Sequence, residues 1–168
     1  MASTSSFDVT TGVDFMEVHN AVDQTTKEIT NRYDFKGLKV GIELNPKDKK
    51  IVLSAPDEYK LTAIWDVLQS KMVRRQVPLK NLKRGKIEPA ASSSVRQEIE
   101  IQDGLTADMA REIARTIKDA KLRKVQAAIQ GDTVRVSSPS KDELQGVMAL
   151  LKQQDYEVEL KFENFRSN

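Results

Sequence analysis

The chain has 168 residues, of which 31% are charged and 39% are hydrophobic, and its formal net charge is +2. This composition excludes a largely disordered chain, and so small a net charge does not by itself indicate a polyanion partner. The sequence contains no cysteine, which excludes disulfides and thiolate metal sites. It has no apolar run of about 18 residues and no secretory leader pattern, so a cytoplasmic protein without membrane contact is expected.

The first half alternates strand and helix signals. A short strand is expected at 7–10, and Asp14 is placed to cap a helix whose stripe includes Phe15 and Ile29. Residues 40–44 alternate as a strand does, 45–48 have turn chemistry, and 51–53 return as the hairpin partner. Pro56 suits the first turn of a second helix. Its expected buried face consists of Leu61, Ile64, Trp65, Leu68 and Met72.

The second half repeats this order after a linker-like stretch at 85–94. A strand is predicted at 95–101, a helix around 109–117, and a hairpin of 125–129 and 134–136 about Gly131-Asp132. Ser140 and Glu143 form a capping-box pattern for the last helix. Val158, Leu160 and Phe162 alternate with charged residues, which predicts a closing strand.

The two halves match in detail, because the segment ending at Pro139 repeats the one ending at Pro56 after 83 residues. Strands with one apolar face need two helices to cover that face. The sequence therefore predicts an α+β protein of two ferredoxin-like, RNA-recognition-like domains, at 1–90 and 91–168. The closing strand of the first half is poorly marked; it falls at 79–87, or the chain termini pair across the halves.

Catalytic signatures are missing from the sequence. His19, the single histidine, is expected on the surface of the first helix, and a lone histidine without cysteine builds no zinc or iron site. No dinucleotide-binding or triphosphate-binding glycine loop occurs. Acidic pairs such as Asp14 with Glu17 lie where helix caps are expected. We therefore expect no enzyme, no metal and no cofactor.

Positive charge gathers in two segments, each of which is interpreted either as a solvated surface or as an anion-binding surface. The first, at 71–86, contains no acidic residue: Lys71, Arg74, Arg75, Lys80, Lys83, Arg84 and Lys86. The second begins in the expected third helix and continues beyond it: Arg111, Arg115, Lys118, Lys121, Arg123 and Lys124. Both could hold a phosphate group.

Aromatic residues are concentrated near the chain ends, and none occurs between Asp66 and Asp155. Base stacking of the RNA-recognition type is therefore largely unavailable on the central strands, where only Phe7 is aromatic. Phe165 departs from the alternation of the closing strand. Edge packing explains this, as does a pocket in which Phe7 or Phe165 stacks on a base while Arg166 meets a phosphate.

Five ordered segments carry a family resemblance: Ser6-Phe7-Asp8-Val9, Arg32-Tyr33-Asp34-Phe35-Lys36-Gly37, Lys86-Ile87-Glu88-Pro89-Ala90, the stretch 124–136, and Phe162-Glu163-Asn164-Phe165-Arg166. They resemble the YajQ family of bacterial proteins over nearly the whole chain. The resemblance implies two ferredoxin-like domains and nucleotide binding without catalysis, with cyclic di-GMP recognised by some members that act in regulation. The linker Ala91-Ser92-Ser93-Ser94 departs from the charged or glycine-containing linker frequent in the family.

The resulting hypothesis is a cytoplasmic, non-enzymatic regulator that binds a purine nucleotide (GTP, ATP or cyclic di-GMP). Charge-driven binding of tRNA or rRNA is the alternative, and a transcription regulator is a further candidate partner. The candidate ligand-binding residues are Phe7, Arg32, Lys36, Arg75, Lys86, Lys118, Lys121, Phe165 and Arg166.

Overall fold

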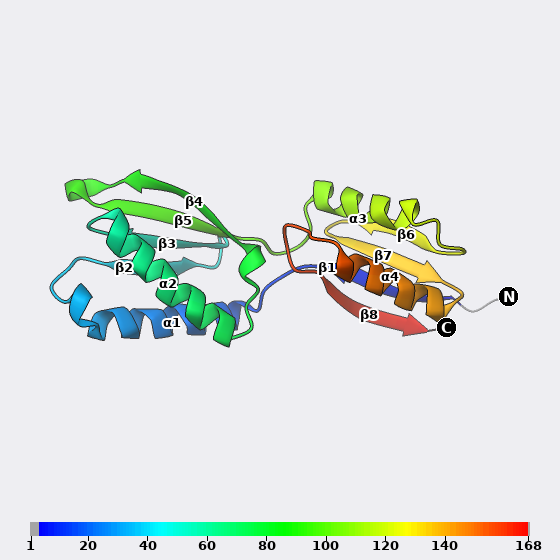
Figure 1. Cartoon of the computed structure of the whole chain (residues 1–168), viewed down its shortest axis with the longest axis horizontal. Helices are drawn as coiled ribbons and strands as arrows, with labels where there is room; N and C mark the ends of the chain where they lie inside the picture. The colour runs from blue at the N-terminus through cyan, green and yellow to red at the C-terminus, as the bar shows by residue number, and fades with distance from the viewer. Residues whose placement is uncertain (1–3, 168) are drawn as a thin grey trace. The chain divides into compact units, whose positions relative to one another are not determined.

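The computed structural model describes residues 4–167, which divide into two compact units. Unit 1 combines the N-terminal residues up to Gly12 with everything from Gly104 onward, and unit 2 is Val13–Asp103. Each unit is one four-stranded antiparallel sheet with two helices packed on one face (Figure 1). The predicted α+β class with two ferredoxin-like domains is confirmed.

Unit 1 has the sheet order β6-β7-β1-β8, with α3 and α4 on the same face. Its elements are β1 (Ser5–Thr10), α3 (Ala107–Asp119), β6 (Gln126–Gln130), β7 (Thr133–Ser138), α4 (Lys141–Gln153) and β8 (Lys161–Ser167). The core between sheet and helices is built from alternate strand residues such as Phe7, Val9, Val134 and Val136, each fully buried.

Unit 2 has the order β2-β3-β5-β4, with α1 and α2 on the same face. Its elements are α1 (Phe15–Asn31), η1 (Tyr33–Phe35), β2 (Gly41–Asn45), β3 (Lys50–Ala55), α2 (Glu58–Arg74), η2 (Leu79–Asn81), β4 (Leu82–Pro89), η3 (Ala91–Ser93) and β5 (Val95–Ile101). The stripe Leu61, Ile64 and Leu68 of α2 is fully buried against Ile51 and Leu53 of β3.

The first strand of each half of the chain belongs to the sheet of the other half. In chain order each half reads strand, helix, strand, strand, helix, strand, but β1 pairs with β7 and β8, whereas β5 pairs with β3 and β4. The sheets therefore do not follow the predicted division at residue 90, because β5 completes the sheet of the preceding residues. The sequence leaves open that the chain termini pair across the halves, and β1 and β8 do pair with each other.

The internal repeat survives in the structure. β3 begins at Lys50 and β7 at Thr133, and α2 begins at Glu58 and α4 at Lys141, so the offset of 83 residues is preserved. Asp57 caps α2 through a hydrogen bond from Lys60 N. The predicted position of Pro56 in the first helical turn is thus wrong by a residue or two, because the proline precedes the cap.

Two predicted boundaries also shift. The first half of the linker-like stretch at 85–94 is strand, since β4 continues to Pro89 on the edge of its sheet, where proline is tolerated, and the connection to β5 is confined to 90–94. The closing strand starts at Lys161, and Val158 is buried in the connection before it. Asp14 and Ser140 do cap α1 and α4 as expected, accepting from Met16 N and Glu143 N. Within residues 4–167, no helix has the length and apolarity needed to cross a bilayer.

Candidate functional site

The nine candidate ligand-binding residues are divided between the two units. Arg32, Lys36, Arg75 and Lys86 lie in unit 2, and the other five lie in unit 1. Within each unit some of these side chains are held by protein groups and others are exposed to a ligand.

Arg32 ends α1 and is held by acidic side chains. Its guanidinium donates to both carboxylate oxygens of Asp34, with Nε–Oδ1 and Nη2–Oδ2 distances of 3.0 and 2.8 Å. It also lies over the ring of Phe35, 5.1 Å from the centroid. The hydrogen bonds from Arg32 lower the pKa of the Asp34 carboxyl and raise that of Arg32. A phosphate would have to displace Asp34, whereas Lys36 is exposed beside it.

The acid-free basic segment is also partly engaged within unit 2. Lys71 pairs with Glu28 at 3.0 Å, and Arg75 pairs with Glu17 at 3.3 Å. Arg84 lies over the Trp65 ring, 4.8 Å from its centroid. These acids come from α1, which packs beside α2, so a run of sequence without acids does not become a surface without acids. Lys86 is exposed on β4.

Phe7 has no exposed surface and belongs to the core of unit 1. Its ring meets Phe162 edge-on and Phe165 at a tilt of 32°, with both pairs of centroids 5.8 Å apart. A base could not stack on Phe7 without repacking this core. Phe7 is therefore a buried residue on which the Phe165 ring packs.

Phe165 and Arg166 line a small hollow between α4 and the end of the sheet, with a volume of about 140 Å³. The Phe165 side chain is 62% exposed. The remaining lining combines β1 and α4: Ser5, Ser6, Phe7, Lys141, Leu144, Gln145, Met148 and Ser167. The hollow thus combines an accessible aromatic ring, apolar walls and the cation Lys141. Arg166 also lines it, but it pairs with Ser6 and acts on Asp8, so its side chain lies toward the uncovered face of the sheet.

A β-bulge brings Phe165 to this hollow. The register between β1 and β8 shifts between Ser6 and Asp8, and Asn164 adopts φ +59° at that point. The extra residue turns Phe165 to the same side as Phe162, which explains the broken alternation of the sequence. Lys141 was not anticipated as a site residue; its position directly after the cap Ser140, at the start of α4, was the available signal.

A larger hollow of about 540 Å³ lies between α3 and the edge strand β6. Its lining is Ala114, Arg115, Ile117, Lys118, Asp119, Val125 and Ala127. Lys118 therefore belongs to a cavity, while Lys121 is exposed in the turn that follows α3, at φ +53°. This hollow has no aromatic lining residue and so offers no surface for base stacking.

The uncovered sheet face of unit 1 is polar. Arg135 of β7 donates from Nε to Asp8 Oδ1 at 3.0 Å, and Asn164 Nδ2 donates to Asp8 Oδ2 at 2.8 Å. The hydrogen bond from Arg135 is the main cause that holds the Asp8 pKa below its ordinary value. Among residues 4–167, no aromatic side chain of unit 1 stands where an RNA-recognition sheet stacks bases, since Phe7 faces the helices.

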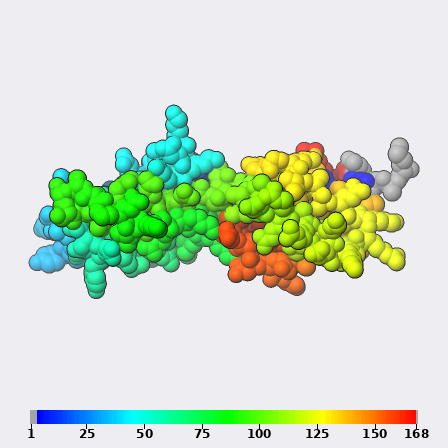
Figure 2. Space-filling model, turned by 90° about the horizontal axis from the view of Figure 1, so that it is seen from above, coloured from blue at the N-terminus to red at the C-terminus, as the bar shows by residue number. Residues whose placement is uncertain are grey.

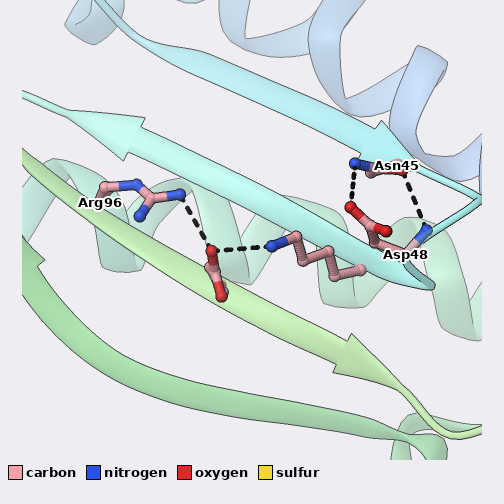
Figure 3. Close-up of polar contacts among 5 residues, drawn as sticks. Asn45, Asp48 and Arg96 are labelled. Carbon is pink, nitrogen blue, oxygen red and sulfur yellow. Dashed lines mark hydrogen bonds and ion pairs between the residues drawn. The ribbon is translucent and has the colours of Figure 1, made fainter.

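The corresponding face of unit 2 carries charges paired across strands. Lys50 Nζ of β3 and Arg96 Nη2 of β5 both lie 3.1 Å from Glu98 Oε1. These contacts lower the pKa of Glu98, with the hydrogen bond from Lys50 as the largest cause. Figure 3 shows Arg96 with its polar contact and, nearby, the hydrogen-bonded Asn45–Asp48 turn. The charged side chains of this face are thus engaged in ion pairs with one another.

A family model described as "Nucleotide-binding protein YajQ-like" matches residues 5–166. The chain belongs to the YajQ-like family. Relatives of this YajQ-like protein include a "Nucleotide-binding protein" of Solibacter usitatus, 49% identical over 98% of both chains. Another of Carboxydothermus hydrogenoformans is 51% identical over 99% of this chain and 100% of the relative. A third, of Koribacter versatilis, is 51% identical over 98% of both chains.

The YajQ-like chain offers no grouping of acidic, histidine or cysteine side chains suited to a metal ion within the part the structure describes. His19 is exposed on α1, as expected from the sequence. The hollow at Phe165 brings an exposed aromatic ring together with the cation Lys141. The Arg32 region also has an exposed aromatic residue, Tyr33, but its guanidinium is held by Asp34.

Proposed function

We propose that this YajQ-like protein binds a purine nucleotide or cyclic di-GMP at the hollow between α4 and β8, and acts as a non-enzymatic cytoplasmic regulator. The observation that carries the proposal is the exposed Phe165 ring beside Lys141, with Arg166 at the adjoining edge of the sheet. An aromatic face binds any base by stacking, and guanidinium and ammonium groups bind phosphate. The printed names of its relatives support the ligand class.

The size of the hollow limits what it holds. Its volume of about 140 Å³ is below the roughly 300–1,000 Å³ of sites that enclose a whole ligand. It accommodates one base or one phosphate, with the rest of the ligand on the surface. The amides at the start of α4 add a partial positive charge next to Lys141, which favours a phosphate there.

A calorimetric titration of the full chain with GTP, ATP and cyclic di-GMP tests the proposal. Phe165→Ala should weaken binding by about 1–3 kcal/mol, or roughly five- to hundredfold, since one stacked base is lost. Arg166→Ala should weaken binding of the charged ligand, with a smaller effect at high salt. Tyr59→Ala and Arg74→Ala are the matched controls, because both residues are exposed and neither lines the hollow.

Absence of heat and of any shift in melting temperature with all three ligands would sink the proposal, as would equal losses in the control variants. The RNA alternative rests on the cations that follow α3. A gel shift with tRNA that fades steeply with salt, in a protein without affinity for small nucleotides, would favour it.

A further inference from the structure

The four edge strands of the two sheets differ in how they are protected. An exposed edge carries unpaired amide and carbonyl groups that can pair with another chain, and proteins block this with charges, proline or bulges. β4 contains a register shift, four charged residues and Pro89. β8 contains the bulge at Asn164 and several charges, and β2 contains Glu43 and is followed by Pro46.

β6 has none of these protections. Its sequence is Gln126-Ala127-Ala128-Ile129-Gln130, without charge, proline or glycine, and it pairs with β7 without a register shift. Every second residue of an edge strand directs its backbone groups outward. Ile129 is 46% exposed, although it pairs with the fully buried Val134. The strand is therefore open for pairing and carries an unburied apolar side chain.

The larger hollow continues this edge. Ala127 of β6 lines it together with Ala114 and Ile117 of α3, so its floor accepts an apolar side chain. Because Ala127 and Ile129 pair with residues of the core face of β7, both lie on the side of α3. The yellow-green α3 and yellow β6 segments contribute to the surface seen in Figure 2.

The charge around the hollow selects the partner. Two cations, Arg115 and Lys118, line the hollow against the single acid Asp119, and Lys121, Arg123 and Lys124 lie in the segment that leads from α3 to β6. Two copies of this chain paired through β6 would bring these cations together, which disfavours a homodimer. RNA would lack aromatic surface here. An extended peptide fits both features: its main chain can pair with β6, its apolar side chains can enter the hollow, and its acidic side chains can contact Arg115 and Lys118.

We propose that β6 and the adjoining hollow bind an extended acidic segment of another protein, which adds to the sheet as a fifth strand. The main-chain pairing supplies affinity, and the hollow with Arg115 and Lys118 supplies specificity. This site is independent of the nucleotide proposal, since it shares no residue with the hollow at Phe165.

The test pans a phage-displayed library of random twelve-residue peptides against the full chain and titrates the enriched peptides into labelled protein by NMR. Enriched sequences should alternate apolar residues with Asp or Glu, and the shifted amides should lie in β6 and the C-terminal half of α3. The double variant R115E/K118E should weaken binding about tenfold or more, because it reverses the charge of the rim. K39E/K47E is the control, with the same charge change on exposed lysines of unit 2.

Ile129→Glu gives a second readout, since it repels an acidic peptide while leaving an exposed position on the surface. Enrichment of basic peptides, shifts confined to other elements, or equal weakening by both double variants would overturn the proposal. The absence of any enriched peptide would also overturn it. A further such outcome is that an RNA homopolymer binds this edge and that R115E/K118E abolishes its binding.

Discussion

Asp8 and Arg135 are joined across the uncovered face of unit 1, although 127 residues separate them in the sequence. Their Nε–Oδ1 hydrogen bond of 3.0 Å connects the two central strands, β1 and β7, and their side chains are 12% and 31% exposed. Asn164 of β8 completes the arrangement by donating to the same carboxylate. The N-terminal strand is thereby bound on both sides by strands made late in the chain.

The Asp8 carboxylate should make stability depend on pH in the acid range. Its pKa is lowered in the folded protein, so the stabilisation is present above its ordinary value of 3.8 and is lost as the pH falls through the lowered pKa. Asp8→Asn should therefore reduce the free energy of unfolding at neutral pH, and the difference from wild type should shrink below about pH 4. Urea unfolding across this range measures it; a difference that grows on acidification would contradict the assignment.

Substitution of Phe7 should mainly reduce the stability of the protein, whereas substitution of Phe165 should mainly reduce nucleotide binding. Phe7→Ala removes a fully buried ring and should cost about 3–5 kcal/mol of unfolding free energy. Phe165→Ala removes an exposed ring and should change stability by only about 0.5 kcal/mol, while it weakens nucleotide binding. Chemical denaturation of both variants checks this contrast, which fails if the two losses of stability are similar.

The strand exchange predicts which fragments fold. Residues 13–103 contain every strand of the β2-β3-β5-β4 sheet and should unfold cooperatively on their own. Residues 104–168 lack the central strand β1 and should remain unfolded, until a synthetic peptide of residues 1–12 restores the sheet. Circular dichroism and NMR dispersion report both results. Independent folding of 104–168 would show that β1 is dispensable.

Gly104 should not tolerate a side chain. It adopts φ +91°, and a Cβ there would lie 2.6 Å from Asp132 Oδ2. Gly104→Ala should therefore destabilise the protein by about 1–3 kcal/mol. Gly146→Ala is the control: it lies within α4 with open space around it, so alanine should stabilise the helix by roughly 0.5–1 kcal/mol. Thermal denaturation distinguishes the opposite signs.

Alternation and capping predicted most of the elements, because they depend on neighbours in sequence. The exchange of β1 and β5 could not be predicted this way. Both strands place apolar residues such as Val9 and Ile99 on one face, and either would complete either core. β4 was obscured for a different reason: it is an edge strand, so Lys83, Arg84 and Lys86 interrupt its apolar pattern without penalty.

The candidate site was harder to predict than the fold. The broken alternation at Phe165 did indicate an unusual position, and the bulge at Asn164 is its physical cause. Charge alone was misleading, because Arg32 and Arg75 are engaged by Asp34 and Glu17. The local pattern around Ser140 places Lys141 at the start of α4, but only the packing of α4 on the sheet brings Lys141 to the hollow.

The pairing of β1 also sets an order of events during synthesis. Residues 5–10 leave the ribosome long before their neighbours in β7 and β8 have been made. Unit 2 can fold once Asp103 has left the ribosome. At that stage β1 is still unpaired, and its apolar side chains are exposed to solvent. A nascent chain stalled between these two points is therefore the form in which this protein is most exposed to proteases and to aggregation.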